Sequence, residues 1–168
     1  VQGNYEVTYV PGTLTINPIN AKITVTITGK TNNKVYDGTE KAVKGYDVVS
    51  ITKAGQAYDL YKETDFGLKD GVKAEAKGTD ADNYPMGLKG SNAGENCSFE
   101  NKSTNFTNIE FIVTDGELAI AKRPVKFTGE SASKEYTGSI LEIIGITAED
   151  ENGNRGLLTG STWSGLTY

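Results

Sequence analysis

The chain has 168 residues, of which 36% are hydrophobic and 23% charged, and its net charge at neutral pH is −5. An acidic chain with dispersed lysines is a poor partner for nucleic acid, because phosphate contacts need clustered cations. The sequence has no histidine and a single cysteine, Cys97, which excludes serine–histidine and cysteine–histidine catalysis, histidine-based zinc sites and an internal disulfide framework. No apolar run approaches the roughly 18 residues of a membrane span, so we expect no membrane insertion of this segment.

The composition favours strands over helices. Glycine accounts for 20 residues, and tyrosine (9) outnumbers phenylalanine (5) and tryptophan (1). Aromatic and β-branched residues are enriched in strands, and no stretch keeps a helical period over three turns. We therefore expect an all-β chain with Ig-like sandwich packing, and a β-grasp unit is the alternative. Helix is expected as short turns, for example near residues 58–64.

Residues 1–17 are predicted to form the closing hairpin of a preceding unit. An alternating stretch is followed by a tight turn at Pro11-Gly12 and by a second short strand. This order of elements is typical of a β-hairpin. The dipeptide Asn17-Pro18 marks a boundary, because proline ends a strand ladder.

A complete unit is expected over residues 18–120. Its clearest strand covers residues 22–28, where Ile23, Val25 and Ile27 alternate with threonines. Strict alternation places these three side chains on one face of a half-buried strand. Turn residues and weaker alternation assign the later segments. They are turns at Asn32-Asn33 and Asp37-Gly38, a strand over 43–51 interrupted at Gly45, a strand over 72–77, a turn over 78–88 leading Tyr84 into the next strand, a loop or irregular edge over 92–105, and a closing hairpin over 108–120 that turns at Asp115-Gly116.

Two stretches of the sequence occur twice. Residues 4–16 share Asn, Glu, Gly, Leu and Ile in place with residues 108–120, and residues 28–45 share Thr, Gly, Lys and Tyr in place with residues 128–145. Self-similarity at a fixed spacing indicates a repeat array. Residues 121–168 are therefore interpreted as the opening part of the next unit, without equivalents of residues 69–120. Incomplete units leave open strand edges, which we expect another copy of the chain or further sequence to cover.

Three short motifs follow one another in the order opener, middle and closer. The opener is Lys34, Tyr36 and Gly38, repeated as Lys134, Tyr136 and Gly138; the middle is Gly78, Thr79, Asp80 and Tyr84; the closer is Tyr9, Gly12, Thr13, Leu14 and Ile16, with Gly116 in its second copy. Together they resemble the MBG and YDG repeats of large bacterial surface proteins, especially those of gut Firmicutes. The chain departs from the family pattern at Asp82, where glycine is usual, and at Val113 and Glu117 in the second closer.

The resemblance implies all-β extracellular repeats, strung between a signal peptide and a wall anchor and acting as stalk or adhesive modules. It supplies no catalytic residue and no cofactor. The expected function is a non-catalytic structural or adhesive module in a tandem array, anchored at the cell surface through other parts of its protein, with neighbouring repeats as partners. The alternative is a specific binder of a host glycoprotein, an immunoglobulin or a glycan such as mucin. A third hypothesis, a glycoside-active accessory module, would need paired carboxylates that no spacing in this sequence selects.

Two features of the sequence could serve either binding or packing. Tyr36 and Tyr136 are expected to place their rings in the core and their hydroxyls on backbone, with stacking against a sugar as the alternative. The stretch Asp80-x-Asp82-Asn83 has the oxygen density of a calcium loop, but it lacks the glycine and the terminal glutamate of the EF-hand pattern. It is therefore predicted to form a plain Asx turn.

Overall fold

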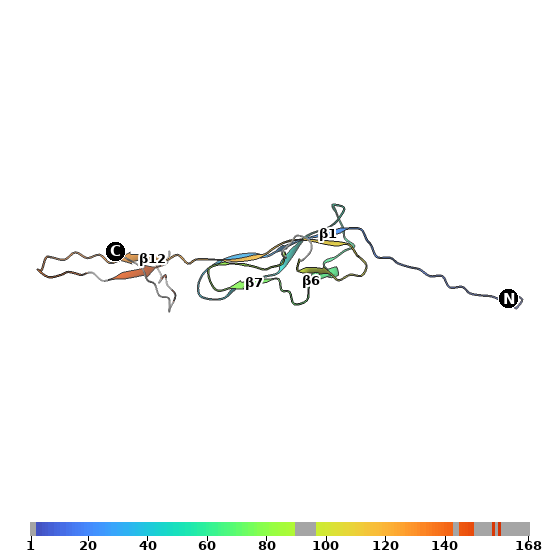
Figure 1. Ribbon diagram of the computed structural model, residues 1–168, viewed down its shortest axis with the longest axis horizontal. Coiled ribbons are helices and arrows are strands. Elements are labelled where there is room, and N and C mark those ends of the chain that lie inside the picture. Colours follow the sequence, from blue (N-terminus) through green and yellow to red (C-terminus); the bar gives the residue numbers. More distant parts are fainter. Residues whose placement is uncertain (1–2, 90–96, 143–144, 150–155, 157, 159–168) are drawn as a thin grey trace.

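Residues 3–89, 97–142, 145–149, 156 and 158 are described by the computed structural model of the chain (Figure 1). Within these residues the chain consists of strands joined by turns, with one 3-10 turn, η1 (Glu63–Asp65), as its sole helical element. The expectation of an all-β chain is confirmed. The 3-10 turn overlaps the segment for which a short helical turn was expected.

Two pairs of parallel strands run through the middle of the molecule. β1 (Ile23–Gly29) pairs with β10 (Ile109–Thr114). β2 (Thr31–Val35) pairs in the same sense with β11 (Glu117–Ala121). The segment from β1 to β2 and the segment from β10 to β11 each pass from the first sheet into the second. The two parallel pairs therefore form one ribbon that spans both sheets.

The remaining strands extend this ribbon or form small sheets beside it. The first sheet has the order β10-β1-β4-β5, in which β4 (Tyr46–Lys53) is antiparallel to β1 and is followed by β5 (Gln56–Ala57). The second has the order β2-β11-β8, with β8 (Asn83–Pro85) antiparallel to β11. Two smaller pairs are β3 (Lys41–Lys44) with β7 (Glu75–Gly78), and β6 (Phe66–Leu68) with β9 (Phe99–Asn101).

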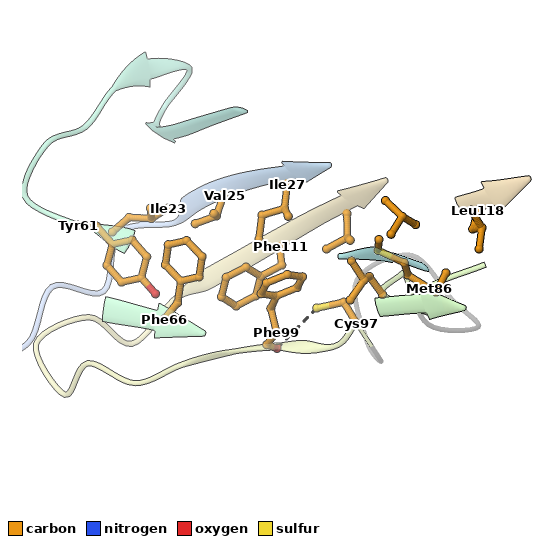
Figure 2. Packing of buried hydrophobic residues seen from close by; sticks show 14 of the residues in the cluster. Ile23, Val25, Ile27, Tyr61, Phe66, Met86, Cys97, Phe99, Phe111 and Leu118 are labelled. Carbon is orange, nitrogen blue, oxygen red and sulfur yellow. Dashed lines mark hydrogen bonds between the residues drawn. The ribbon is translucent and has the colours of Figure 1, made fainter. Parts of the chain in front are cut away.

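The hydrophobic core lies between β1 and β10 on one side and β6 and β9 on the other (Figure 2). Ile23, Val25 and Ile27 are 0% exposed, as the alternation predicted. Full burial of one such side chain contributes about 1.5–3 kcal/mol to folding. Aromatic rings fill the space below β1, with neighbouring centroids 5.1 to 6.0 Å apart. In order of contact these rings belong to Phe106, Tyr61, Phe66, Phe111 and Phe99.

The closing hairpin predicted over residues 108–120 is wrong. β10 and β11 belong to different sheets, and each runs parallel to a strand from the N-terminal part of the unit. The dipeptide Asp115-Gly116 therefore marks a passage between sheets. A tight hairpin turn and such a passage both favour a glycine, so the local sequence did not distinguish them.

Smaller expectations change as well. Asn32-Asn33 lies within β2, because β11 supplies a partner strand along that segment. The strand predicted over 72–77 begins at Glu75. Part of the loop or irregular edge predicted over 92–105 is the short strand β9, and residues 92–96 lie outside the described residues. The interruption at Gly45 is confirmed, with a φ of 94° between β3 and β4.

Residues 3–18 contain no strand and extend away from the rest of the molecule (Figure 1). The hairpin predicted for residues 4–16 is therefore wrong in this structure. Its apolar side chains are exposed, among them Tyr9, Leu14 and Ile16. The first contact with the unit is the parallel bridge between Ile19 and Phe106.

The C-terminal part carries one described strand pair. β12 (Lys126–Gly129) is antiparallel to β13 (Ile146–Glu149). Gly129 lies opposite Ile146, just as Gly29 lies opposite Tyr46 in the pair β1–β4. The two pairings thus share their register at positions that the sequence correspondence makes equivalent.

Candidate functional site

The first opener motif forms a compact turn between β2 and β3. The carboxylate of Asp37 accepts hydrogen bonds from the backbone nitrogen of Thr39 at 3.0 Å and from its hydroxyl at 2.6 Å. The ammonium of Lys41 lies 2.6 Å from the same carboxylate. The hydrogen bond from Lys41, followed by those from Thr39, holds the pKa of Asp37 well below its usual range. Gly38 has a φ of 79°, which glycine adopts without strain.

Tyr36 of the same motif packs at the edge of the core. Its side chain is half-buried against the hydrophobic cluster, and its backbone nitrogen donates to the carbonyl oxygen of Ala121 at 2.9 Å. It also lines a hollow of about 310 Å³, together with Asp80, Lys122 and Leu158. Lys34 is exposed on β2, opposite Ile120 of β11.

The middle motif builds a tyrosine corner. The hydroxyl of Tyr84 donates to the carbonyl oxygen of Asp80 at 3.1 Å. The ring of Tyr84 lies directly over Gly78, where any Cβ would overlap it. The carboxylate of Asp82 accepts a hydrogen bond from the backbone nitrogen of Asn83 at 2.8 Å, and the Asp82 carbonyl oxygen accepts one from Ile120 at 2.9 Å. The carboxylate bond reaches the next residue and not the one two further on, so it is not the bond of the predicted Asx turn; the carbonyl bond ties the loop to β11.

The second closer carries a carboxylate that holds a neighbouring loop. Asp115 accepts hydrogen bonds from the backbone nitrogens of Gly87 at 3.0 Å, Leu88 at 2.8 Å and Gly116 at 3.0 Å. Leu88 is fully buried, so this carboxylate satisfies a donor at the edge of the core. Asp115 thus fastens the chain after β8 to the passage between β10 and β11.

Sequence reasoning missed a hydrogen-bonded hub at Asn101. Its Oδ1 accepts from the hydroxyl of Tyr61 at 3.0 Å and from the backbone nitrogen of Ser103 at 3.1 Å. Its Nδ2 donates to the carbonyl oxygens of Phe106 at 2.7 Å and Ser103 at 3.0 Å. Tyr61 is 1% exposed, and burial, with the nearby charge of Asp65, raises its pKa to about 12. No repeated motif marks either residue, so the sequence held no signal for this pair.

The second opener is placed differently from the first. Gly138 has a φ of 75°, close to that of Gly38. Tyr136, however, is 90% exposed, so the expectation that its ring lies in the core is wrong in this structure. Lys134 is exposed too, and a Cβ built at Gly12 in the first closer would meet no described atom within 4 Å. The structure therefore does not bring the second opener together with the first.

A shallow groove runs along the outer edge of β4. Its volume is about 600 Å³, and it is lined by residues of β4 and of the segment before η1, including Tyr58, Asp59, Lys62 and Glu63. The ammonium of Lys53 lies 5.1 Å from the centroid of the Tyr58 ring. The groove thus places a half-buried aromatic ring beside mixed charges.

The described residues contain neither a metal-binding cluster nor an exposed thiol. No group of three or more His, Cys, Asp and Glu residues described here could hold a metal ion. Cys97 is buried, and its thiol donates to the carbonyl oxygen of Phe99 at 3.6 Å (Figure 2). No helix within the described ranges is long and apolar enough to cross a membrane.

No protein-family model matches the chain, and searches of curated proteins and of solved structures also returned no match.

Proposed function

We propose that the chain is a non-catalytic structural or adhesive module of a bacterial cell-surface protein, displayed outside the cell and acting as part of a stalk. The observation that carries the proposal is the parallel ribbon of β1 with β10 and β2 with β11. Its first strand starts at the side from which residues 3–18 extend, and β11 ends at the side of β12 (Figure 1). Tension between the two ends therefore loads these pairs in shear, with many hydrogen bonds resisting together.

The motif residues support a structural role because their described bonds hold turns or the core. Asp37 binds backbone and side-chain donors of its own turn, Asp115 binds backbone donors of a neighbouring loop, and Tyr84 closes a corner. A catalytic site would instead direct such groups toward a shared cleft.

The tandem arrangement is supported by equivalent bonds in the two parts of the chain. The backbone nitrogen of Lys30 donates to Gly45 at 3.1 Å, and that of Glu130 donates to Gly145 at 3.0 Å. We propose that residues 18–120 form one unit and residues 121–168 the opening part of the next, with residues 1–17 closing a preceding unit. Adjacent units then meet end to end, as a stalk requires.

An Ig-like sandwich is the architecture that we propose for each unit. The core lies between strands on two sides, as in a sandwich of two packed layers. A β-grasp unit wraps its sheet around a helix. Among the described residues the 3-10 turn Glu63–Asp65 is too short to fill that place.

Single-molecule force measurements test the stalk proposal. A chain held at Ala21 and Lys122 should unfold at high force, because the parallel pairs break in shear. Holding the same chain at Ala21 and Gly55 should lower the unfolding force, because these points lie at the same end of the antiparallel pair β1–β4, where Ile23 is opposite Lys53, and its bonds then break one at a time. Equal, low forces in both directions would contradict a load-bearing role.

Binding of a host glycoprotein, immunoglobulin or glycan is the second candidate function, favoured by the groove at Tyr58. Arrays of mucins, immunoglobulins and glycans would test it with the whole chain. Saturable binding that Tyr58→Ala abolishes would support this function. Tyr136→Ala is the matched control, because Tyr136 is an exposed tyrosine away from the groove.

A further inference from the structure

The extended segment at residues 4–16 carries the side-chain pattern of β10 and β11 without their environment. The correspondence of residues 4–16 with 108–120 places Tyr9 on Val113, Leu14 on Leu118 and Ile16 on Ile120. Val113, Leu118 and Ile120 are 8%, 0% and 4% exposed. Tyr9, Leu14 and Ile16 are 83%, 86% and 84% exposed. The apolar side chains that are buried in residues 108–120 are thus open to solvent at the equivalent positions of residues 4–16.

The edge of β12 matches the edge of β1 that β10 covers. In the complete unit, the backbone nitrogen of Ile23 donates to Asn108 at 2.9 Å. Since backbone donors alternate along a strand, the nitrogen of Val25 also faces β10, and that of Thr24 faces β4. Within the described residues the sheet of β12 contains β12 and β13 alone. The equivalent of Val25 is Val125, and Pro124, which has no N–H, falls at the position of Thr24. Proline therefore removes no donor from the edge of β12 that corresponds to the β10-facing edge of β1.

We propose that residues 4–16 of one copy of this chain pair, in parallel, with β12 and residues 131–135 of a second copy. The register of β1 with β10 then places Val7 opposite Val125 and Val10 opposite Thr128. The register of β2 with β11 places Leu14 opposite Ala132 and Ile16 opposite Lys134. The pairing is a strand addition, in which backbone bonds give affinity and alternate side chains give register.

Two pairs of residues carry the specificity of this contact. In the complete unit, Lys22 and Glu110 form an ion pair at 2.9 Å, and their equivalents are Lys122 and Glu6. Gly29 and Gly116 lie against each other where the ribbon changes sheet, and their equivalents are Gly129 and Gly12. A Cβ at Gly12 or Gly129 would meet no described atom within 4 Å in the single chain. Among the described atoms both glycines have room in the single chain, and in the paired state they would lie in close contact.

The partner is a second copy because residues 3–18 and β12 lie at opposite ends of the central unit (Figure 1). Such a contact is heterologous, and it propagates head to tail unless it closes into a ring. The inference rests on the repeat correspondence used in the proposed function but not on any ligand. A chain that remains monomeric would overturn the pairing and leave the load-bearing role to be judged by its own force measurement.

Sedimentation velocity of the whole chain tests the pairing, at concentrations up to roughly 1 mM so that weak association is detected. The wild-type chain should form oligomers that grow with concentration. Gly12→Val and Gly129→Val should each remove them, and Gly3→Val is the matched control because a Cβ at Gly3 also meets no described atom. A wild-type monomer throughout, or oligomers that persist in both Gly12→Val and Gly129→Val, would overturn the proposal.

Charge reversal tests the register independently. Glu6→Lys and Lys122→Glu should each weaken association by about two- to fivefold, as expected for an exposed ion pair. The double variant Glu6→Lys/Lys122→Glu should recover the wild-type association, because the pair is restored with its charges exchanged. Additive losses in the double variant would show that the two residues do not meet.

Discussion

Gly29 and Gly116 lie backbone to backbone at the point where both central segments pass from one sheet to the next. A Cβ on Gly29 would overlap the backbone nitrogen of Gly116, and one on Gly116 would lie 2.5 Å from the carbonyl oxygen of Lys30 and 2.6 Å from the sulfur of Met86. Both glycines are buried. Relief of the overlap would require the paired strands to move apart.

Gly29→Ala and Gly116→Ala should therefore each destabilise the central unit by about 1–3 kcal/mol, the usual cost of overpacking a core. Urea unfolding followed by circular dichroism measures the loss as a lower midpoint. The matched control is Gly3→Ala, because a Cβ at Gly3 would meet no described atom within 4 Å. A Gly29→Ala midpoint equal to that of the control would contradict the close approach.

The hydrogen bonds at Asn101 predict losses of folding stability that differ in size between variants. Tyr61→Phe removes one hydrogen bond and should cost about 0.5–1.5 kcal/mol. Asn101→Ala should cost about 1–3 kcal/mol, because it leaves the carbonyl oxygen of Phe106 and the nitrogen of Ser103 without that partner. The double variant should lose less than the sum of the two, since both changes break the same bond. Strict additivity in denaturant unfolding would show that the hydroxyl and the amide do not interact.

Stability should fall at alkaline pH because of Tyr61. Its pKa is raised from 10.0 to about 12 in the folded chain, first by burial and then by the charge of Asp65. The unfolded state releases this proton first, so the contribution of Tyr61 is complete below pH 10 and is lost as the pH rises toward 12. Thermal unfolding across this range checks the effect. Tyr61→Phe should have a shallower alkaline decline than the wild type, and identical slopes would rule out Tyr61 as the cause.

Tyr36 and Tyr136 should respond differently to truncation despite their equivalent sequence positions. Tyr36→Ala should cost about 1–2 kcal/mol, less than a fully buried ring, because its side chain is half-buried against the core. Tyr136→Ala should change stability by less than about 0.5 kcal/mol, because its ring is exposed. Differential scanning calorimetry of both variants makes the comparison. Equal losses would mean that the two openers share one environment.

The turn between β4 and β5 offers a stabilising change. Ala54 has a φ of 51° and Gly55 a φ of 79°, so a non-glycine residue occupies the left-handed region in a two-residue hairpin. Ala54→Asn should raise stability by about 0.5–1 kcal/mol, because asparagine tolerates this conformation. Ala54→Val is the opposing control and should lower the melting temperature. Stabilisation by valine would show that the turn adopts another conformation.

The local pattern was sufficient for features that depend on one strand or one turn. Alternation of Ile23, Val25 and Ile27 predicted the buried face of β1, because side chains of a strand point to opposite sides with a period of two. The break at Gly45 and the turn at Asp37-Gly38 were also predictable, since glycine permits a positive φ. The composition indicated an all-β chain because aromatic and β-branched residues are enriched in strands.

Pairing between distant strands was decided by the tertiary structure. The stretch 108–120 has the same local signature whether it folds back as a hairpin or continues into a second sheet. It takes the second course because β1 and β2 offer it parallel partners along both halves. Tyr61, which precedes η1, and Asn101, which ends β9, form their hydrogen bond because the fold brings these distant segments together. By itself the sequence determined which faces are apolar and where the chain can bend; only the packing of residues far apart in the chain decided which strands meet, because local preference carries no information about a distant partner.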